Sequence, residues 1–184
     1  MKKHIFLTGF MGSGKSTIGK KLAAQLQVRF IDTDDRIEAL HAIEIKDIFK
    51  NEGENRFREY EETLLAEIIN KEDPAVISLG GGTLLSEINL EKVLSSGTLI
   101  YIKSAPSEIW NRIKHSTRRP LLRKDGEEWN KEMYLERIAH LMKEREKGYR
   151  MAHMVLDRDG KEVDEIVDNL LSKLGINLSR RRSD

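Results

Sequence analysis

The chain has 184 residues, 39% hydrophobic and 34% charged, and its 32 basic and 31 acidic side chains give a net charge of +1. This balance gives no general attraction to nucleic acid or anionic membranes, and the absence of cysteine excludes disulfides and thiolate metal sites. No apolar stretch reaches the about 20 residues that span a membrane, and the N-terminal apolar run is too short for a signal peptide. We therefore expect a cytoplasmic globular chain with no membrane or nucleic-acid partner.

The N-terminal segment predicts a strand, a phosphate-binding loop and a helix. An apolar run at residues 5–7 precedes G-F-M-G-S-G-K-S at residues 9–16, which has the spacing G-x-x-x-x-G-K-S. Glycines let backbone N–H groups turn toward phosphate oxygens, the lysine adds a positive charge, and the serine hydroxyl can bind Mg²⁺. The alternative is a glycine-rich turn before an ordinary helix. The complete pattern favours a phosphate loop followed by an amphipathic helix over residues 15–27.

A second apolar run, residues 28–31, ends in Asp32-Thr33-Asp34. A strand, a helix and a second strand form a βαβ unit, which places the carboxyl ends of both strands at the ligand-binding edge of an α/β sheet. If the segment is extended, Asp32 and Asp34 point to the same side, where one orients metal-bound water and the other accepts a proton from a hydroxyl group. The alternative is a helix N-cap, with Asp34 or Asp35 opening the next helix.

Strands and helices alternate through the rest of the chain. The sequence predicts two short helices over 35–50, a helix over 54–70, a strand over 75–79, a helix over 86–95, a strand over 98–102, a helix over 106–115, a long helix over 128–147, a strand over 154–156 and a helix over 162–174. This order predicts a three-layer α/β fold with a mostly parallel five-stranded sheet flanked by helices. We expect one domain over residues 1–174, with a polar, basic lid at about 114–127 and a basic tail over 175–184.

Three further groups of residues are candidates for a site. The triple glycine at 80–82 predicts a backbone that approaches a ligand closely or adopts positive φ. Arg56 and Arg58 stand on a glutamate-rich helix, where surface ion pairing is the default interpretation. Arg119 lies in the expected lid with Arg118 and Arg123, which are either solvated or close over a transferred phosphoryl group.

Together these landmarks resemble the shikimate kinase family over about residues 3–172. The shared motifs are the phosphate loop Gly9 to Thr17, Asp32-Thr33-Asp34, Gly53-Glu54 with Phe57-Arg58, Leu79 to Gly82, Arg119-Pro120-Leu121-Leu122, and Arg145 with Tyr149 four residues on. Many nucleotide-binding proteins share the loop alone, and the conjunction in this order is much more specific. Ala42 stands where the family usually has a glycine. The resemblance implies ATP-dependent phosphorylation of the 3-hydroxyl of shikimate, a step in chorismate and aromatic amino acid biosynthesis.

The resemblance also implies a role for each matching residue on the nucleotide side. The ATP phosphates would be held by Gly12, Ser13, Gly14, Lys15, Ser16 and Thr17. The Ser16 hydroxyl would bind Mg²⁺, and Asp32 would support the metal through its water shell with help from Ser78. Arg119 would reach the ATP phosphates during transfer, and Lys15 would act with it in catalysis.

On the substrate side, the resemblance implies that helices at about residues 33–62 hold shikimate. Asp34 would hydrogen-bond the substrate hydroxyls and stand nearest to a general base. Arg58 and Arg145 would clamp the carboxylate, because two guanidinium forks match a planar anion. Gly81 would give its backbone N–H to the substrate. We expect a monomer that binds shikimate and ATP.

Other functions remain open at this point. A gluconate or nucleoside-monophosphate kinase would use the same scaffold, and a nucleotide-dependent binding module or switch would use the loop without catalysis. The run Arg180 to Arg182 is weak evidence for nucleic-acid binding, since near-neutral charge argues against it.

Overall fold

The computed structural model describes residues 4–71, 73–114 and 130–176. Of the lid predicted at about 114–127, the residues from 115 on, with Arg118, Arg119 and Arg123, lie outside the described residues. So do residues 177–184 of the predicted tail. Within the described ranges, none of the helices combines the length and the apolar character needed to cross a membrane.

A five-stranded sheet forms the centre of the fold, in the order β2-β3-β1-β4-β5. Its strands are β1 (His4–Thr8), β2 (Arg29–Asp32), β3 (Ala75–Ser78), β4 (Gly97–Lys103) and β5 (Met154–Asp157). Every neighbouring pair is parallel, with Leu7 of β1 opposite Ser78 and Ile100. The predicted three-layer α/β fold is therefore confirmed, and the carboxyl ends of all five strands meet at one edge.

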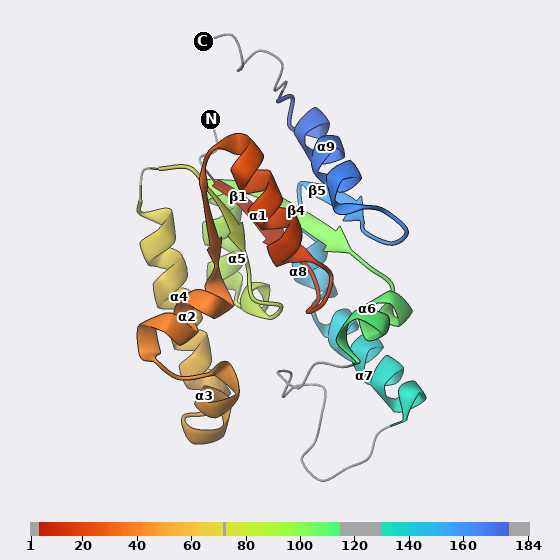
Figure 1. The fold of residues 1–184 in the computed structure, drawn as a ribbon. Coiled ribbons are helices and arrows are strands. Elements are labelled where there is room, and N and C mark those ends of the chain that lie inside the picture. The colour runs from red at the N-terminus through yellow and green to blue at the C-terminus, as the bar shows by residue number, and fades with distance from the viewer. Residues whose placement is uncertain (1–3, 72, 115–129, 177–184) are drawn as a thin grey trace.

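Two layers of helices cover the sheet (Figure 1). On one face lie α1 (Lys15–Leu26) and α9 (Val163–Lys173), and on the other α4 (Glu54–Ile69) and α5 (Glu87–Ser96). The helical stripes predicted from spacing are buried here, and one core cluster joins Leu22 of α1 to Leu170 of α9. A second cluster packs Leu65 of α4 against Ile77 of β3. Because the three central strands, β3, β1 and β4, are mostly buried between these layers, the packing fixes the positions of their carboxyl ends.

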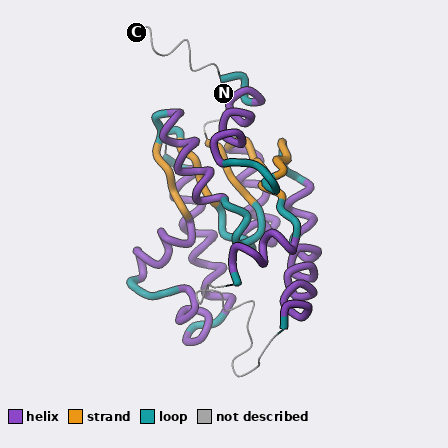
Figure 2. The backbone as a smooth tube through the Cα atoms, turned by 45° about the vertical axis from the view of Figure 1, so that its right-hand side comes forward, coloured by secondary structure: helices purple, strands orange, loops and turns teal. Residues whose placement is uncertain are grey.

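The remaining helices lie beyond the carboxyl edge of the sheet in two groups, on either side of the phosphate loop (Figures 1 and 2). One group is α2 (Thr33–His41) and α3 (Ile45–Asn51), which pack on α4. The other is α6 (Pro106–Ile113) and α7 (Lys131–Glu144), followed by α8 (Glu146–Arg150). A short 3₁₀ turn, η1 (Thr83–Leu85), connects β3 to α5. The two groups frame the space above the loop.

Two predicted helices differ from the structure. The helix expected to open at residue 35 begins at Thr33, so Asp34 is helical and not extended. The long helix expected over 128–147 is two helices within the described residues, α7 and α8, which meet at Arg145. Arg145 turns its side chain into the interior, where it is 5% exposed.

Ala42 ends α2 in the left-handed conformation, with φ 53° and ψ 35°. A residue with a Cβ is strained there by about 1 kcal/mol, which explains why a glycine suits this position. The turn into α3 nevertheless forms, since α2 and α3 both pack against the second core cluster through Ile37 and Ile48.

Candidate active site

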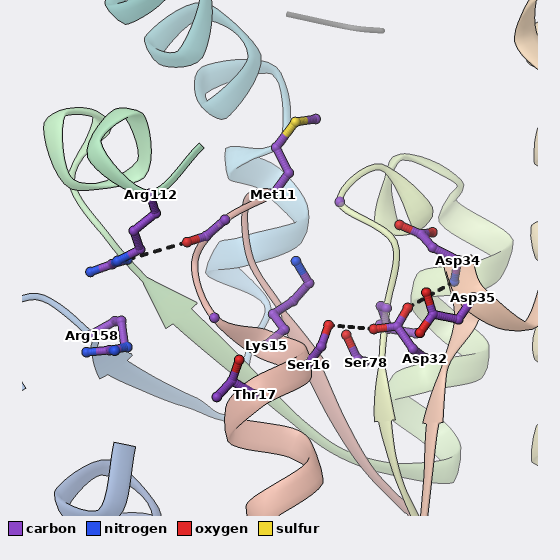
Figure 3. A pocket seen from close by; sticks show the side chains of 14 residues that line it. Met11, Lys15, Ser16, Thr17, Asp32, Asp34, Asp35, Ser78, Arg112 and Arg158 are labelled. Atoms are coloured by element: carbon purple, nitrogen blue, oxygen red, sulfur yellow. Dashed lines mark hydrogen bonds between the residues drawn. The ribbon is translucent and has the colours of Figure 1, made fainter. Parts of the chain in front are cut away.

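A cavity of about 420 Å³ lies over the phosphate loop at the carboxyl edge of the sheet. It is lined by Met11, Gly12, Gly14, Lys15, Ser16, Thr17, Asp32, Asp34, Asp35, Ser78, Leu79, Gly81, Arg112 and Arg158. Figure 3 shows the acidic side chains on one side of the loop and the two arginines on the other. The structure thus brings together most residues predicted to hold the nucleotide and the metal.

The loop itself needs glycine at three of its positions, the first of which is Gly9, with φ of 149°. Gly12 and Gly14 have φ of 78° and 96°, and a methyl group on Gly12 would lie 2.5 Å from Cγ2 of Ile113. Gly14 is the N-cap of α1, whose first turn contains no acidic residue, so its N–H groups present positive potential to an anion. Lys15 lies over the loop, and its Nζ donates to the carbonyls of Gly9 and Phe10 at 2.9 and 3.2 Å.

Asp32 accepts hydrogen bonds from two elements through its two carboxylate oxygens. Its Oδ1 accepts the backbone N–H of Asp34 at 3.1 Å and so caps α2, while its Oδ2 accepts the hydroxyl of Ser16 at 2.6 Å. The N-cap is therefore Asp32, and neither Asp34 nor Asp35 has that role. The prediction that Asp32 and Asp34 share one side of an extended segment is wrong, because the helix already starts between them. Both carboxylates still line the cavity.

The triple glycine provides space for side chains of the protein itself. A methyl group on Gly81 would lie 2.9 Å from Nη1 of Arg145, and one on Gly82 would lie 2.7 Å from Nη2 of Arg58. None of the three glycines has positive φ, so conformational freedom is not the reason for them. The two guanidinium groups therefore flank the glycine run, although α4 and the α7–α8 junction that carry them are far apart in sequence.

Arg58 belongs to a charged network on α4. It donates through Nη2 to Glu54 at 2.7 Å and through Nη1 to Glu61, whose side chain is buried and also accepts from the Thr83 hydroxyl at 2.6 Å. Burial alone would lower the pKa of Arg58, but the two carboxylates more than offset burial and raise it. Arg56, in contrast, is half exposed and pairs with Glu59, as surface ion pairing predicts.

Arg145 is a buried cation that faces the ring of Phe10, with 5.1 Å from Cζ to the ring centroid. Its Nη1 is buried and has no hydrogen-bond acceptor among the described residues. Next to it, burial raises the pKa of Tyr149 to about 12, although Arg145 acts in the opposite direction. The Tyr149 hydroxyl therefore stays neutral. Among the described residues no carboxylate forms an ion pair with this buried guanidinium group, which therefore favours binding of an anion.

The sequence analysis missed Arg112 and Arg158 on the other side of the loop. Arg112 donates to the Ser104 hydroxyl at 2.8 Å and to the Gly12 carbonyl at 3.5 Å. Asp159 fixes this corner by accepting from Ser104, from Arg112 and from the Ala105 backbone N–H at 2.6 Å. A usable signal was present, because Ser104 and Arg158 directly follow β4 and β5 and so stand at the same edge as Asp32.

Comparison with known proteins identifies the family. The family model described as shikimate kinase matches residues 11–175 of the chain. The shikimate kinase of Chlorobaculum tepidum is 44% identical over 183 residues, which are 98% of this chain and 95% of the relative. The chain belongs to the shikimate kinase family. The predicted assignment to a kinase of this family is confirmed.

Solved structures agree with this assignment. Shikimate kinase from Acinetobacter baumannii, in complex with shikimate, superposes with a TM-score of 0.85 at 28% identity, covering 94% of this chain and 92% of the other. A gluconokinase from Sinorhizobium meliloti reaches a TM-score of 0.56 at 16% identity, covering 95% and 92% of the two chains. At that identity it shows only the shared fold, so the rival gluconate kinase gains no support beyond the scaffold.

Proposed function

We propose that this shikimate kinase transfers the γ-phosphoryl group of ATP to the 3-hydroxyl of shikimate at the cavity over the phosphate loop. The observation that carries the proposal is the buried guanidinium group of Arg145, whose Nη1 has no acceptor among the described residues. It lies against the glycine run, with Arg58 at the next glycine. Two guanidinium groups beside a glycine run whose Gly81 lines the cavity suit a small substrate that carries a carboxylate.

In this proposal the substrate lies between the two arginines and Asp34. Arg58 and Arg145 hold the carboxylate, and the backbone N–H of Gly81 donates to the substrate. Asp34 accepts the hydrogen bond of the 3-hydroxyl and is the group nearest to take its proton as the oxygen bonds to phosphorus and ADP leaves. Because the transition state of phosphoryl transfer is loose, positioning and charge contribute most of the rate.

The nucleotide lies on the opposite side of the cavity. We assign the phosphates to the loop from Gly12 to Thr17 and to Lys15, which exchanges its two loop carbonyls for phosphate oxygens. Arg112 and Arg158 line the far end of the cavity and contact the rest of the nucleotide. Arg119, outside the described residues, is assigned to the phosphates during transfer.

The residues present also fit Mg²⁺. Ser16 and Asp32 provide two oxygen atoms at the loop, 2.6 Å apart. Among the described residues there is no cluster of three acidic or histidine ligands, which suits an ion that is usually bound by one or two side chains, substrate phosphates and water. Mg²⁺ would supply charge neutralisation at the phosphates, with Ser16 as ligand and Asp32, helped by Ser78, holding its water.

We further propose that the domain works as a cytoplasmic monomer over residues 1–174. Apart from Arg119, every side chain that we assign to the reaction belongs to the described part of a single chain, which supports this proposal. ATP is the co-substrate, which favours the cytoplasm. Size-exclusion chromatography with light scattering tests the monomer, and a dimer mass of about 42 kDa, twice the 21.2 kDa of one chain, would contradict it.

Product analysis tests the reaction itself. The purified protein is incubated with Mg²⁺, ATP and shikimate, and phosphorus–proton correlation NMR identifies the carbon that carries the phosphate. We expect coupling to the proton at carbon 3. A phosphate on another hydroxyl would overturn the placement of Asp34 against the 3-hydroxyl.

A further inference from the structure

Thr33, between the two aspartates, makes a contact that neither the metal nor the substrate explains. It is 3% exposed, so its hydroxyl does not face the cavity solvent. The hydroxyl donates to the carbonyl of Ser78 at 3.2 Å and accepts the backbone N–H of Gly80 at 2.9 Å. One side chain at the start of α2 therefore binds two backbone groups at the end of β3.

The position of these two groups explains the need for the contact. Asp32 and Ser78 are the last register pair of β2 and β3, and the chain then leaves the sheet because α2 begins at Thr33. On the other side of β3, the N–H of Leu79 still pairs with the Leu7 carbonyl at 2.9 Å. The groups of residues 78 and 80 that face β2 would be buried without a backbone partner, which is costly.

We infer that Thr33 is a positioning residue that sets the glycine run, residues 80–82, against Asp34. Its hydroxyl makes the two hydrogen bonds that backbone groups of a longer β2 would otherwise make to β3. A hydroxyl has one donor and two acceptor sites, so it can satisfy a carbonyl and an N–H together. The distance it fixes is tight, because a methyl group on Gly80 would lie 2.6 Å from Oδ1 of Asp34. Gly81, the next residue, is the one assigned to the substrate.

The kinetic consequence rests on the proposed function. Thr33→Val keeps the shape and removes the hydroxyl, whereas Thr33→Ser keeps the hydroxyl. Thr33→Val should lower kcat/KM for shikimate about 10- to 100-fold, since small misplacements at a reacting centre have effects of this size. The KM for ATP should change less than about twofold, because the hydroxyl of Thr33 bonds to Ser78 and Gly80 and to none of the described residues assigned to the ATP phosphates. Thr33→Ser should restore kcat/KM to near the wild-type value.

Thr98→Val is the matched control, because Thr98 is half-buried near the start of β4, opposite Ile5 and away from the carboxyl edge. It should keep wild-type kinetics. An equal loss in this control would assign the effect to a general loosening of the sheet and overturn the inference. If Thr33→Val does not fold, Thr33→Ala is compared with Thr33→Ser, which again contrasts a side chain without the hydroxyl and one with it.

Amide hydrogen exchange gives a readout that needs no substrate. The Gly80 amide should exchange faster in Thr33→Val than in wild type and remain protected in Thr33→Ser. If the wild type phosphorylated no shikimate, the proposed function would fail while the exchange of Gly80 would still decide the role of Thr33. Equal Gly80 exchange in the Val and Ser variants, or unchanged kcat/KM for shikimate in Thr33→Val, overturns the inference.

Discussion

The hydroxyl of Ser16 donates a 2.6 Å hydrogen bond to Oδ2 of Asp32, which joins the first turn of α1 to the end of β2. The bond links the phosphate loop to the acidic side of the cavity. The bond also sets two oxygen atoms side by side at the pair to which the proposed function assigns the metal ion. The assignment of the metal to this pair leads to the first prediction.

Asp32→Asn should raise the Mg²⁺ concentration for half-maximal activity at least about tenfold, as expected when a residue outside the ligand shell loses its charge. Asparagine is also a good N-cap, so α2 and the thermal stability should be retained. Activity is measured against free Mg²⁺ at saturating shikimate. Asp168→Asn, on the exposed side of α9, is the control. An unchanged Mg²⁺ dependence would remove Asp32 from the metal site.

Lys15→Ala should lower kcat at least about 10²-fold, the usual effect of removing a preorganised charge at a reacting group. Lys15 is 9% exposed at the loop, whereas Lys20 of the same helix is exposed. Lys20→Ala should therefore retain the wild-type rate. Steady-state ADP release measures both variants. Normal turnover by Lys15→Ala would show that the phosphate-loop assignment is wrong.

Arg58→Ala should raise the KM for shikimate by about 10²-fold, because the guanidinium fork assigned to the substrate carboxylate is lost. The KM for ATP should stay the same. The KM of Arg58→Lys for shikimate should lie between those of the wild type and Arg58→Ala, since lysine keeps the positive charge but lacks the guanidinium fork. Arg56→Ala is the matched control, because Arg56 stands two residues earlier on the same helix and is half exposed. A large loss of ATP affinity in Arg58→Ala would contradict the carboxylate role.

The corner fixed by Asp159 predicts a pH dependence of stability. Partial burial would raise the pKa of Asp159, but hydrogen bonds from Ser104, Ala105 and Arg112 lower it overall. A lowered pKa stabilises the folded chain above the unfolded value of about 3.9, and this stability is lost as pH falls through the folded pKa. The Tm of Asp159→Ala should thus lie below that of the wild type by the largest amount at pH 7, and this difference should decrease below about pH 4.

Thermal unfolding from pH 7 to pH 3 measures this difference. The exposed neighbour Asp157 serves as control through Asp157→Ala, which should show a smaller difference at every pH. A Tm difference for Asp159→Ala that grew toward low pH would contradict the sign of the effect.

Ala42→Gly should raise the stability by about 1 kcal/mol, because glycine adopts the left-handed conformation at φ 53° without strain. For a chain of this length the Tm should rise by about 2–4 °C. Ala39→Gly, inside the same helix, should lower stability by about 1 kcal/mol. Both changes are measured by thermal or urea unfolding. A lower Tm for Ala42→Gly would show that the left-handed turn is not strained.

Local patterns predicted the parts of the fold that local chemistry determines. The phosphate loop, the alternation of strands and helices, and the apolar stripe of α1 depend on residues close in sequence. The sheet order could not be obtained in this way, because β3 inserts between β1 and β2 through pairings of distant segments. The start of α2 was placed two residues late, since a capping aspartate inside a D-T-D segment looks the same in either conformation.

The site shows the same division. The triple glycine was singled out for approach to a ligand or for positive φ, but none of its glycines has positive φ, and the arginine side chains beside it come from α4 and from the α7–α8 junction, which no local pattern connects to it. Nothing in the charged run before Arg145 marks the helix break there. The double role of Asp32 depends on Ser16, which lies on another element and comes within reach only when β2 pairs beside β3.

The central claim is tested most directly by ADP release from Mg²⁺ and ATP with four acceptor conditions: shikimate, gluconate, a nucleoside monophosphate and no acceptor. We predict rapid turnover with shikimate and only background release in the other three. Turnover with gluconate or the nucleoside monophosphate in place of shikimate would contradict the assignment of Arg58 and Arg145 to the shikimate carboxylate. Background release in all four conditions would contradict the catalytic function.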